Sequence, residues 1–186
     1  MQIFFSIVLF TLASGFAVIK DEAPTKNIPL FDGKTFKGWE GDTAHTWRIE
    51  DGVLVGGSLA ETVPHNEFLA TTRSYSDFVL KLKFKLLGDE GFVNSGVQFR
   101  SQRIDDPPYE MTGYQADIGD GYWASLYDES RRNKVLVHAD TALISRVLRR
   151  NEWNDYEIRV QGNRFTPCCT IRMIARIFRS IRRSSP

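Results

Sequence analysis

The chain has 186 residues and a formal net charge of +1, with 24 basic and 23 acidic residues. This length fits one domain with a substantial core, and the near-zero charge excludes a protein drawn to nucleic acid by its overall field. The charge is unevenly distributed, because residues 166–186 contain five arginines and no acid. Residues 1–165 therefore carry 19 basic against 23 acidic side chains and are mildly acidic.

The first seventeen residues resemble a secretory signal peptide. Residues 3–16 are almost wholly apolar, and Gly15 and Ala17 put small residues at the −3 and −1 positions of a cleavage site. We expect cleavage after Ala17 and a secreted or periplasmic bacterial protein. The apolar run is short for a membrane span, so no membrane association is expected after cleavage. Residues 18–27 are polar and are predicted to be a linker.

Short strands separated by turns are predicted for most of the remaining chain. Residues 47–55 contain an Asp51-Gly52 turn between two apolar runs, which indicates a β-hairpin. In residues 78–86, every second residue starting from Phe78 is a large apolar one. The residues between them are Val79 and three lysines, as expected for a strand with one solvated face. Further strands are predicted at residues 68–72, 95–100, 114–118, 135–137 and 153–160, and a short helix at 141–150. No long amphipathic helix is predicted, which indicates an all-β sandwich or jelly roll.

Residues 94–129 are unusually rich in carboxylates, amides, guanidinium groups and aromatic rings. This mixture suits a sugar, because rings stack on its C–H faces and planar polar groups bind its hydroxyls. Gln98 and Arg100 share one face of a predicted strand, and Gln115 and Asp117 share one face of another. Side by side, these strands would line one concave surface. The alternative interpretation is a polar loop between two strands.

Several kinds of functional site lack their sequence signals. The chain has no paired cysteine or histidine spacing for zinc, no Gly-x-Ser-x-Gly motif, no phosphate-binding loop and no calcium loop. Asp117 with residues 119–121 is interpreted as a Gly-rich turn rather than a cation site. We therefore predict neither a metal nor a cofactor. No cysteine occurs between residues 18 and 165, so the fold does not rely on disulfides.

An ordered series of motifs resembles the 3-keto-disaccharide hydrolase family. Residues 30–39 read LFDGKTFKGW and resemble the family's LFDGK-x-x-x-GW opening, and residues 47–54 resemble its W-x-x-x-DG-x-L hairpin. The blocks NSGVQFRS at 94–101, GYQADIGD at 113–120 and EWNDY at 152–156 follow in family order. The resemblance runs from Leu30 to about Phe165. It implies a concanavalin-like β-sandwich jelly roll that acts on sugars.

The sequence departs from the family pattern in two places. The family often has Glu where this chain has Gln115 and Gln where it has Asp117, so the carboxylate is displaced by two residues. After Phe165 the family's closing strand is replaced by unrelated residues, and strand periodicity stops. We therefore expect a domain over residues 28–165, incomplete at its C-terminus through a frameshift or truncation. Residues 166–186 would then form an aberrant basic tail, and stability would be reduced.

The resemblance implies a hydrolase that cleaves disaccharides or glycosides oxidised to a ketone at position 3. Glu110 and Asp117 are assigned acid and base roles, and Arg100 is expected to polarise the ketone or to orient a carboxylate. The predicted carbohydrate-binding residues are Asn94, Gln98, Gln115, Trp123, Tyr127, Asp128 and Glu129. For each acid the alternative is a turn cap or an ion pair with Arg131 or Arg132. For the protein the alternatives are a non-catalytic carbohydrate-binding module and an inactive fragment. The sugar, the linkage and the oligomeric state stay open.

Overall fold

The structure is a computed structural model that describes residues 27–169, with the backbone alone for residues 165–169. Residues 27–30 belong to a first unit, and a second unit begins at Phe31. The described strands and helix all lie in the second unit. Within residues 27–169, no helix has the length and apolar character needed to cross a membrane. The predicted signal peptide and linker lie almost entirely outside the described residues.

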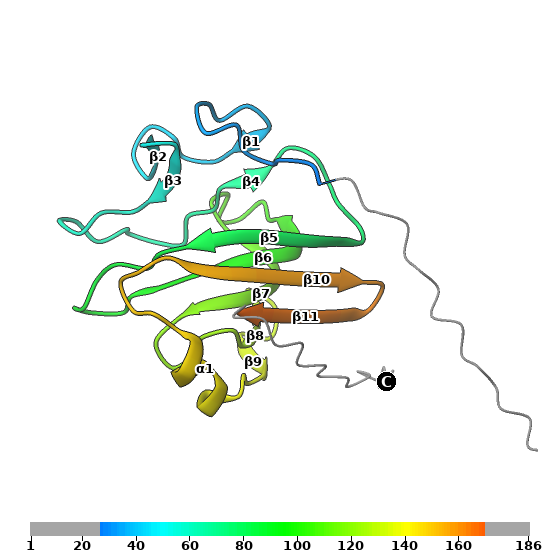
Figure 1. Cartoon of the computed structure of the whole chain (residues 1–186). Coiled ribbons are helices and arrows are strands. Elements are labelled where there is room, and N and C mark those ends of the chain that lie inside the picture. The colour runs from blue at the N-terminus through cyan, green and yellow to red at the C-terminus, as the bar shows by residue number, and fades with distance from the viewer. Residues whose placement is uncertain (1–26, 170–186) are drawn as a thin grey trace, which may run out of the picture. The chain divides into compact units, whose positions relative to one another are not determined.

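Two antiparallel sheets form the two layers of the second unit (Figure 1). The first sheet has the strand order β11-β10-β5, with bounds Arg164–Cys169, Asn154–Gln161 and Phe78–Phe84. The second sheet has the order β6-β7-β8-β9, with bounds Asn94–Arg103, Met111–Gly119, Leu126–Glu129 and Lys134–Val137. This arrangement confirms the predicted all-β, concanavalin-like sandwich.

Two small strand pairs precede the strands of the two sheets, and one helix lies between β9 and β10. Strand β1 (Trp39–Glu40) pairs with β4 (Ala70–Thr71), and β2 (Trp47–Glu50) pairs with β3 (Val53–Gly56). The predicted Asp51-Gly52 turn closes the β2–β3 hairpin, with φ values of 48° and 78°. Helix α1 (Thr141–Val147) confirms the predicted short helix but ends three residues earlier. The Asp140 carboxylate caps its first turn.

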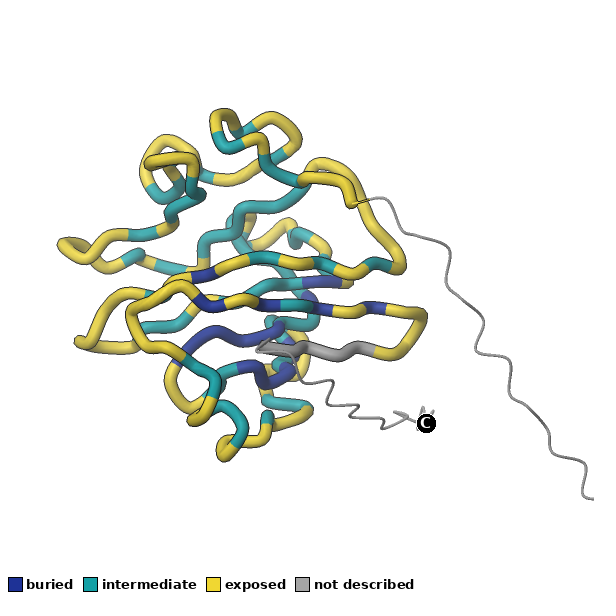
Figure 2. Tube along the Cα trace, viewed as in Figure 1, coloured by how far each residue is buried: buried dark blue, intermediate teal, exposed yellow. Residues whose placement is uncertain are grey.

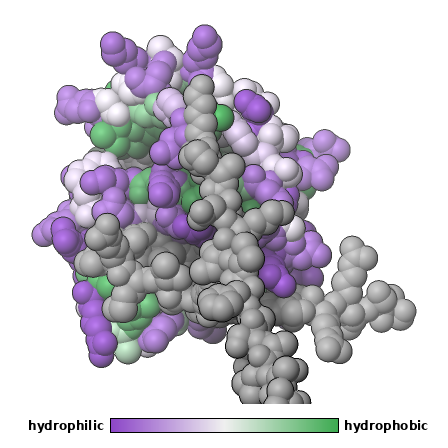
Figure 3. Space-filling view, turned by 45° about the vertical axis from the view of Figure 1, so that its right-hand side comes forward, coloured by the Kyte–Doolittle hydropathy of each residue, from purple (hydrophilic) through white to green (hydrophobic). Residues whose placement is uncertain are grey.

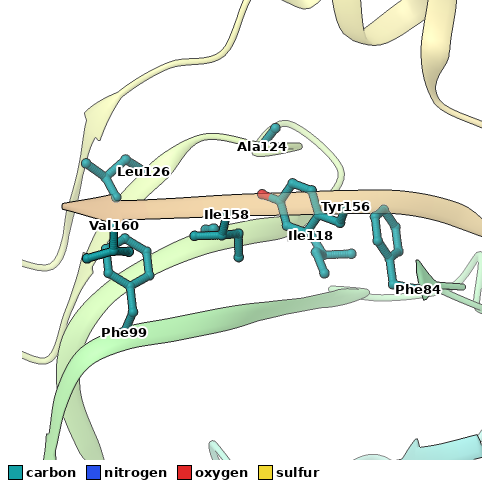
Figure 4. Close-up of a cluster of buried hydrophobic side chains, with 9 residues drawn as sticks. Phe84, Phe99, Ile118, Ala124, Leu126, Tyr156, Ile158 and Val160 are labelled. Atoms are coloured by element: carbon teal, nitrogen blue, oxygen red, sulfur yellow. The ribbon is translucent and has the colours of Figure 1, made fainter. Parts of the chain in front are cut away.

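The hydrophobic core lies between the two sheets. Along β10, buried and more exposed residues alternate, and Figure 2 shows this as alternating colours on one strand. Figure 4 shows the side chains of β10 packing toward those of the second sheet. The buried apolar residues are Phe84, Phe99, Ala116, Ile118, Ala124, Leu126, Tyr156, Ile158 and Val160. Where the face drawn in Figure 3 is not grey, hydrophilic residues surround smaller hydrophobic patches.

Regular structure continues beyond the expected boundary at Phe165. Strand β11 pairs with β10 as far as Cys169, which lies opposite Tyr156. The predicted loss of strand structure after Phe165 is therefore wrong for residues 166–169. These residues form the edge strand of the first sheet, where Pro167 is tolerated because an edge strand has one unpaired side. Residues 170–186, the rest of the predicted tail, lie outside the described residues.

Candidate active site on the outer face of the second sheet

The residues opposite the core on β6, β7 and β8 form a polar surface, which we call the acid face. Phe99, Ala116 and Leu126 point into the core, so the alternate residues of their strands point outward. The strand register then places outward residues next to one another across the sheet: Gly96 beside Asp117, and Gln98 beside Gln115, which lies beside Tyr127. The acid face consists of Gln98, Gln115, Asp117, Tyr127 and Glu129, with Glu110 at its edge.

Glycines on the acid face allow long polar side chains to lie flat on the sheet. A Cβ atom at Gly96 would lie 2.5 Å from the Gln115 side chain, and one at Gly119 would lie 2.4 Å from Asn94 Nδ2. Real Cβ atoms do not approach other heavy atoms this closely, so only glycine fits at these two positions without movement of a neighbour. Gln115 therefore crosses Gly96 and reaches Asp117, where its Nε2 donates to Oδ1 at 2.8 Å.

Asp117 is the most unusual group of the acid face. It is only 3% exposed, and in the described part of the structure its Oδ2 atom has no hydrogen-bond partner. Burial raises the pKa of the Asp117 carboxyl from 3.8 to about 6, against a smaller lowering by the Gln115 hydrogen bond. Asp117 therefore changes its charge near neutral pH, as an acid or base catalyst requires.

Two further groups of the acid face, Glu129 and Tyr127, have raised pKa values. Burial raises the pKa of Glu129, and the charges of Glu110, Asp117 and Asp128 raise it further, against a lowering by the Ser130 backbone N–H. Burial and the neighbouring carboxylates, with Glu129 first, also raise the pKa of Tyr127. Acidic groups that lie close together in a partly buried environment each disfavour the ionisation of their neighbours. Glu129 and Tyr127 thus hold their protons more tightly than isolated groups of the same kind would.

Glu110 is held at the edge of the acid face by the segment before β4. Its Oε2 atom accepts from Asn66 Nδ2 at 3.0 Å, and its Oε1 atom accepts from the Met111 backbone N–H at 2.8 Å. Next to this contact the rings of His65 and Tyr109 stack, with centroids 3.6 Å apart and an interplanar angle of 9°. Both oxygens of Glu110 are therefore engaged, unlike those of Asp117.

The structure does not bring Arg100 to the acids, against our prediction. A β-bulge interrupts the register between Phe99 and Gln102, and Arg100 has a positive φ of 52°. The bulge turns the Arg100 side chain toward the first sheet, where Nη2 donates to Asp77 Oδ1 at 3.0 Å and to the Gly162 carbonyl at 3.1 Å. Ser101 takes the outward position, and its Oγ donates to Gln98 Oε1 at 2.7 Å.

Trp123 and Asp128 also lie elsewhere than predicted. Trp123 packs against the core beside Phe84, with ring centroids 6.2 Å apart, and its indole N–H donates to Asp120 Oδ1 at 2.8 Å. It is therefore not placed to stack on a sugar at the acid face. Asp128 is 1% exposed and lies on the inward side of β8. It forms ion pairs with Arg131 and Arg132 at 2.7 and 3.1 Å, which is the alternative role we considered for each acid.

Sequence reasoning missed the contribution of residues before β4 and at the end of β6. Asn66 is 44 residues from the Glu110 that it contacts, so no local pattern connects the two. Arg103 lies opposite Met111 in the register and comes within 3.8 Å of Glu40 on β1. Its position beyond the bulge is not readable from strand alternation, because one extra residue exchanges the two faces.

The described residues of the acid face are suited to proton transfer. Within residues 27–169, no three His, Cys, Asp or Glu side chains are grouped as a metal site would require. Asp117 and Glu129 carry raised pKa values, while Gln98, Asn94 and Tyr127 supply hydrogen-bonding groups and a ring. Such a surface can move protons to and from a polyhydroxylated ligand.

The two facing antiparallel sheets define a concanavalin-like sandwich. A family model described as the 3-keto-alpha-glucoside-1,2-lyase-like domain matches residues 26–174, and the chain belongs to this family. The match confirms the family resemblance of the sequence motifs and supports a carbohydrate-related, glycosidase-like role. A search of the curated proteins finds no match to the chain.

Proposed function

We propose that the acid face cleaves the glycosidic bond of a 3-keto-glycoside by acid–base chemistry. A ketone at C3 acidifies the hydrogen on C2. A base removes that proton, the electron pair forms a C1–C2 double bond, and the C1–O bond breaks. A proton donor delivers hydrogen to the departing oxygen, which leaves as an alcohol. Water then adds across C1–C2 and restores a free 3-keto sugar, so the net reaction is hydrolysis.

Asp117 is the proposed base, and its environment is the observation that carries this function. One of its oxygens has no hydrogen-bond partner in the described part of the structure, while both oxygens of Glu110 are occupied. Its raised pKa makes the Asp117 carboxylate more basic than an exposed aspartate, yet leaves it ionised above about pH 6. The carboxylate is therefore basic and its Oδ2 atom is unpaired; because this atom is also covered in the structure, a neighbouring side chain must move before the substrate reaches it.

Glu129 is the proposed proton donor, since burial and neighbouring acids raise its pKa. The amide group of Gln98 replaces Arg100 as the proposed donor to the ketone oxygen, and the Asn94 amide is a proposed donor to a sugar hydroxyl. Tyr127, between Gln115 and the acids, is the proposed ring against the sugar. These roles need no fixed separation of two carboxylates, unlike those in ordinary glycosidases.

The test compares turnover of a 3-keto-disaccharide with turnover of its unoxidised parent. We expect activity on the oxidised sugar alone, with kcat/KM rising with pH through about 6 as Asp117 loses its proton. Asp117→Asn should lower kcat by a factor of about 100 or more. Asp155→Asn is the matched control, because Asp155 is exposed on the other sheet. Full turnover by Asp117→Asn would refute the assignment, and binding without any product would identify a carbohydrate-binding module instead.

A further inference from the structure

A second group of side chains continues the acid face past the start of β6. Phe92 is 79% exposed, although a large apolar ring gains free energy by leaving water. Its ring meets that of Tyr122 edge to face, with centroids 6.4 Å apart and an interplanar angle of 82°. This geometry is favourable for two aromatic rings and leaves much of the Phe92 ring uncovered.

The strand register connects this pair of rings to the acids. Phe92 lies two residues before Asn94, and Asn94 pairs with Gly119 on β7. Tyr122 follows Gly119 in a tight turn, where its N–H donates to the Gly119 carbonyl at 3.0 Å. The next pair along the strands that points the same way is Gly96 with Asp117. Two residues of an extended strand span about 7 Å, so the Asn94–Gly119 pair is within the length of one sugar ring from Asp117.

The turn after Gly119 sends its two large aromatic residues in opposite directions. Trp123 packs inward on Phe84, whereas Tyr122 meets the exposed Phe92. The phenol of Tyr122 also acts electrostatically on Tyr127, which belongs to the acid face. Phe92, Tyr122 and Asn94 are therefore continuous with the acids.

We propose that Phe92, Tyr122 and Asn94 bind the leaving-group sugar of the substrate. This inference rests on the function proposed for the acid face. The reacting sugar requires amides and acids around its ketone, and these groups lie on the side of Asp117 toward Gln98 and Gln115. The opposite side of Asp117 offers an exposed ring and one amide, which suit an unreacted sugar. Its C–H face stacks on Phe92, and its hydroxyls bond to the Asn94 amide.

Binding to the Asp117→Asn variant tests this subsite without turnover. The two probes are a 3-keto-glucose disaccharide and methyl 3-keto-α-glucoside, which share the reacting sugar but differ in the leaving group. In this background, Phe92→Ala should raise the Kd of the disaccharide by about five-fold, the effect of one lost aromatic contact. The Kd of the methyl glycoside should change by less than about two-fold. Because Phe92 is exposed, the substitution leaves the core intact.

Val79→Ala is the matched control, since Val79 is a half-exposed apolar residue on β5 of the other sheet. It should alter neither Kd. Equal effects of Phe92→Ala on the two probes, no effect on either, or no binding of the disaccharide would each overturn the subsite. Turnover by the unsubstituted protein is measured separately. If it cleaves both probes but the subsite test fails, the inference alone is wrong. If it cleaves neither, the proposed function fails.

Discussion

The outward faces of the two sheets differ in whether their charged side chains are paired. On the first sheet, exposed acids and bases neutralise each other: Lys83 lies 3.7 Å from Asp155, and Glu157 lies 3.6 Å from Lys81 and 2.6 Å from Arg159. On the second sheet, the acid face gathers carboxylates instead. In the described part of the chain, none of its three acids forms an ion pair.

This difference indicates where the molecule gives up stability for reactivity. Paired charges in water contribute little to folding, and their removal costs little. A buried acid without a cation opposes folding when it ionises, and such groups concentrate at functional sites. Asp117 and Asp128 show the same contrast within one sheet. Both are buried, but Asp128 has two arginines and Asp117 has none among the described residues.

Asp128→Asn should cause the largest loss of stability, about 3 kcal/mol, because it removes the charge-assisted contacts of this buried carboxylate with Arg131 and Arg132. Urea unfolding at pH 7 measures the change in the free energy of unfolding. Since Asp128 faces away from the acid face, the kcat of the folded fraction should change little. A stability equal to that of the unsubstituted protein would show that the two ion pairs do not matter.

Gly96→Ala should destabilise the protein by about 2 kcal/mol and disturb the acid face together. The new Cβ would meet the Gln115 side chain at 2.5 Å, so Gln115 must leave its hydrogen bond to Asp117. Thermal unfolding measures the first effect and turnover the second. The double variant Gly96→Ala/Gln115→Ala removes the clash, and it should regain stability but not activity. Full stability of Gly96→Ala alone would contradict this packing.

The stability difference between the protein and its Asp117→Asn variant should depend on pH. The pKa of Asp117 is higher in the folded state than in the unfolded chain, so between about pH 4 and 6 the folded state binds more protons. Stability from this group is present at low pH and is lost as pH rises through about 6. Relative to the variant, the protein should lose about 2 kcal/mol from pH 4 to pH 8, as measured by urea unfolding. A constant difference would argue against a raised pKa.

Lys83→Ala should have the smallest effect, below about 0.5 kcal/mol, because its ion pair with Asp155 is exposed and 3.7 Å long. The same urea series measures it, and added salt should reduce the difference further. A loss above about 1 kcal/mol would mean that the pairs of the first sheet also support the fold.

The fold was predictable where alternation is strict, as in residues 78–86, and where a turn has its own signal, as at Asp51-Gly52. Strand β8 gave no such signal, since Asp128 points inward beside Leu126 and polarity does not alternate. Strand β11 contains Pro167, which looks incompatible with a sheet until its place at the edge is known.

Half of the candidate site followed from the same alternation. Gln98, Gln115 and Asp117 share the outward face because their strands are regular and adjacent. The prediction for Arg100 was wrong because a β-bulge adds one residue to the strand and so exchanges its two faces. The sequence carries no signal for this bulge. Glu129 faces the site rather than Asp128, and the choice between two neighbouring acids depends on a strand that was not predicted.

The bulge at Arg100 also bears on the order of events in folding. Arg100 and the Gly162 N–H both bond Asp77 Oδ1, so one carboxylate joins three segments that are up to 85 residues apart in the chain. Contacts so distant in sequence form only after much of the chain has been brought together, and they are absent from early, locally built states. Because this pair is largely exposed, we expect its contribution to be small and to lie in the unfolding rate rather than in the folding rate.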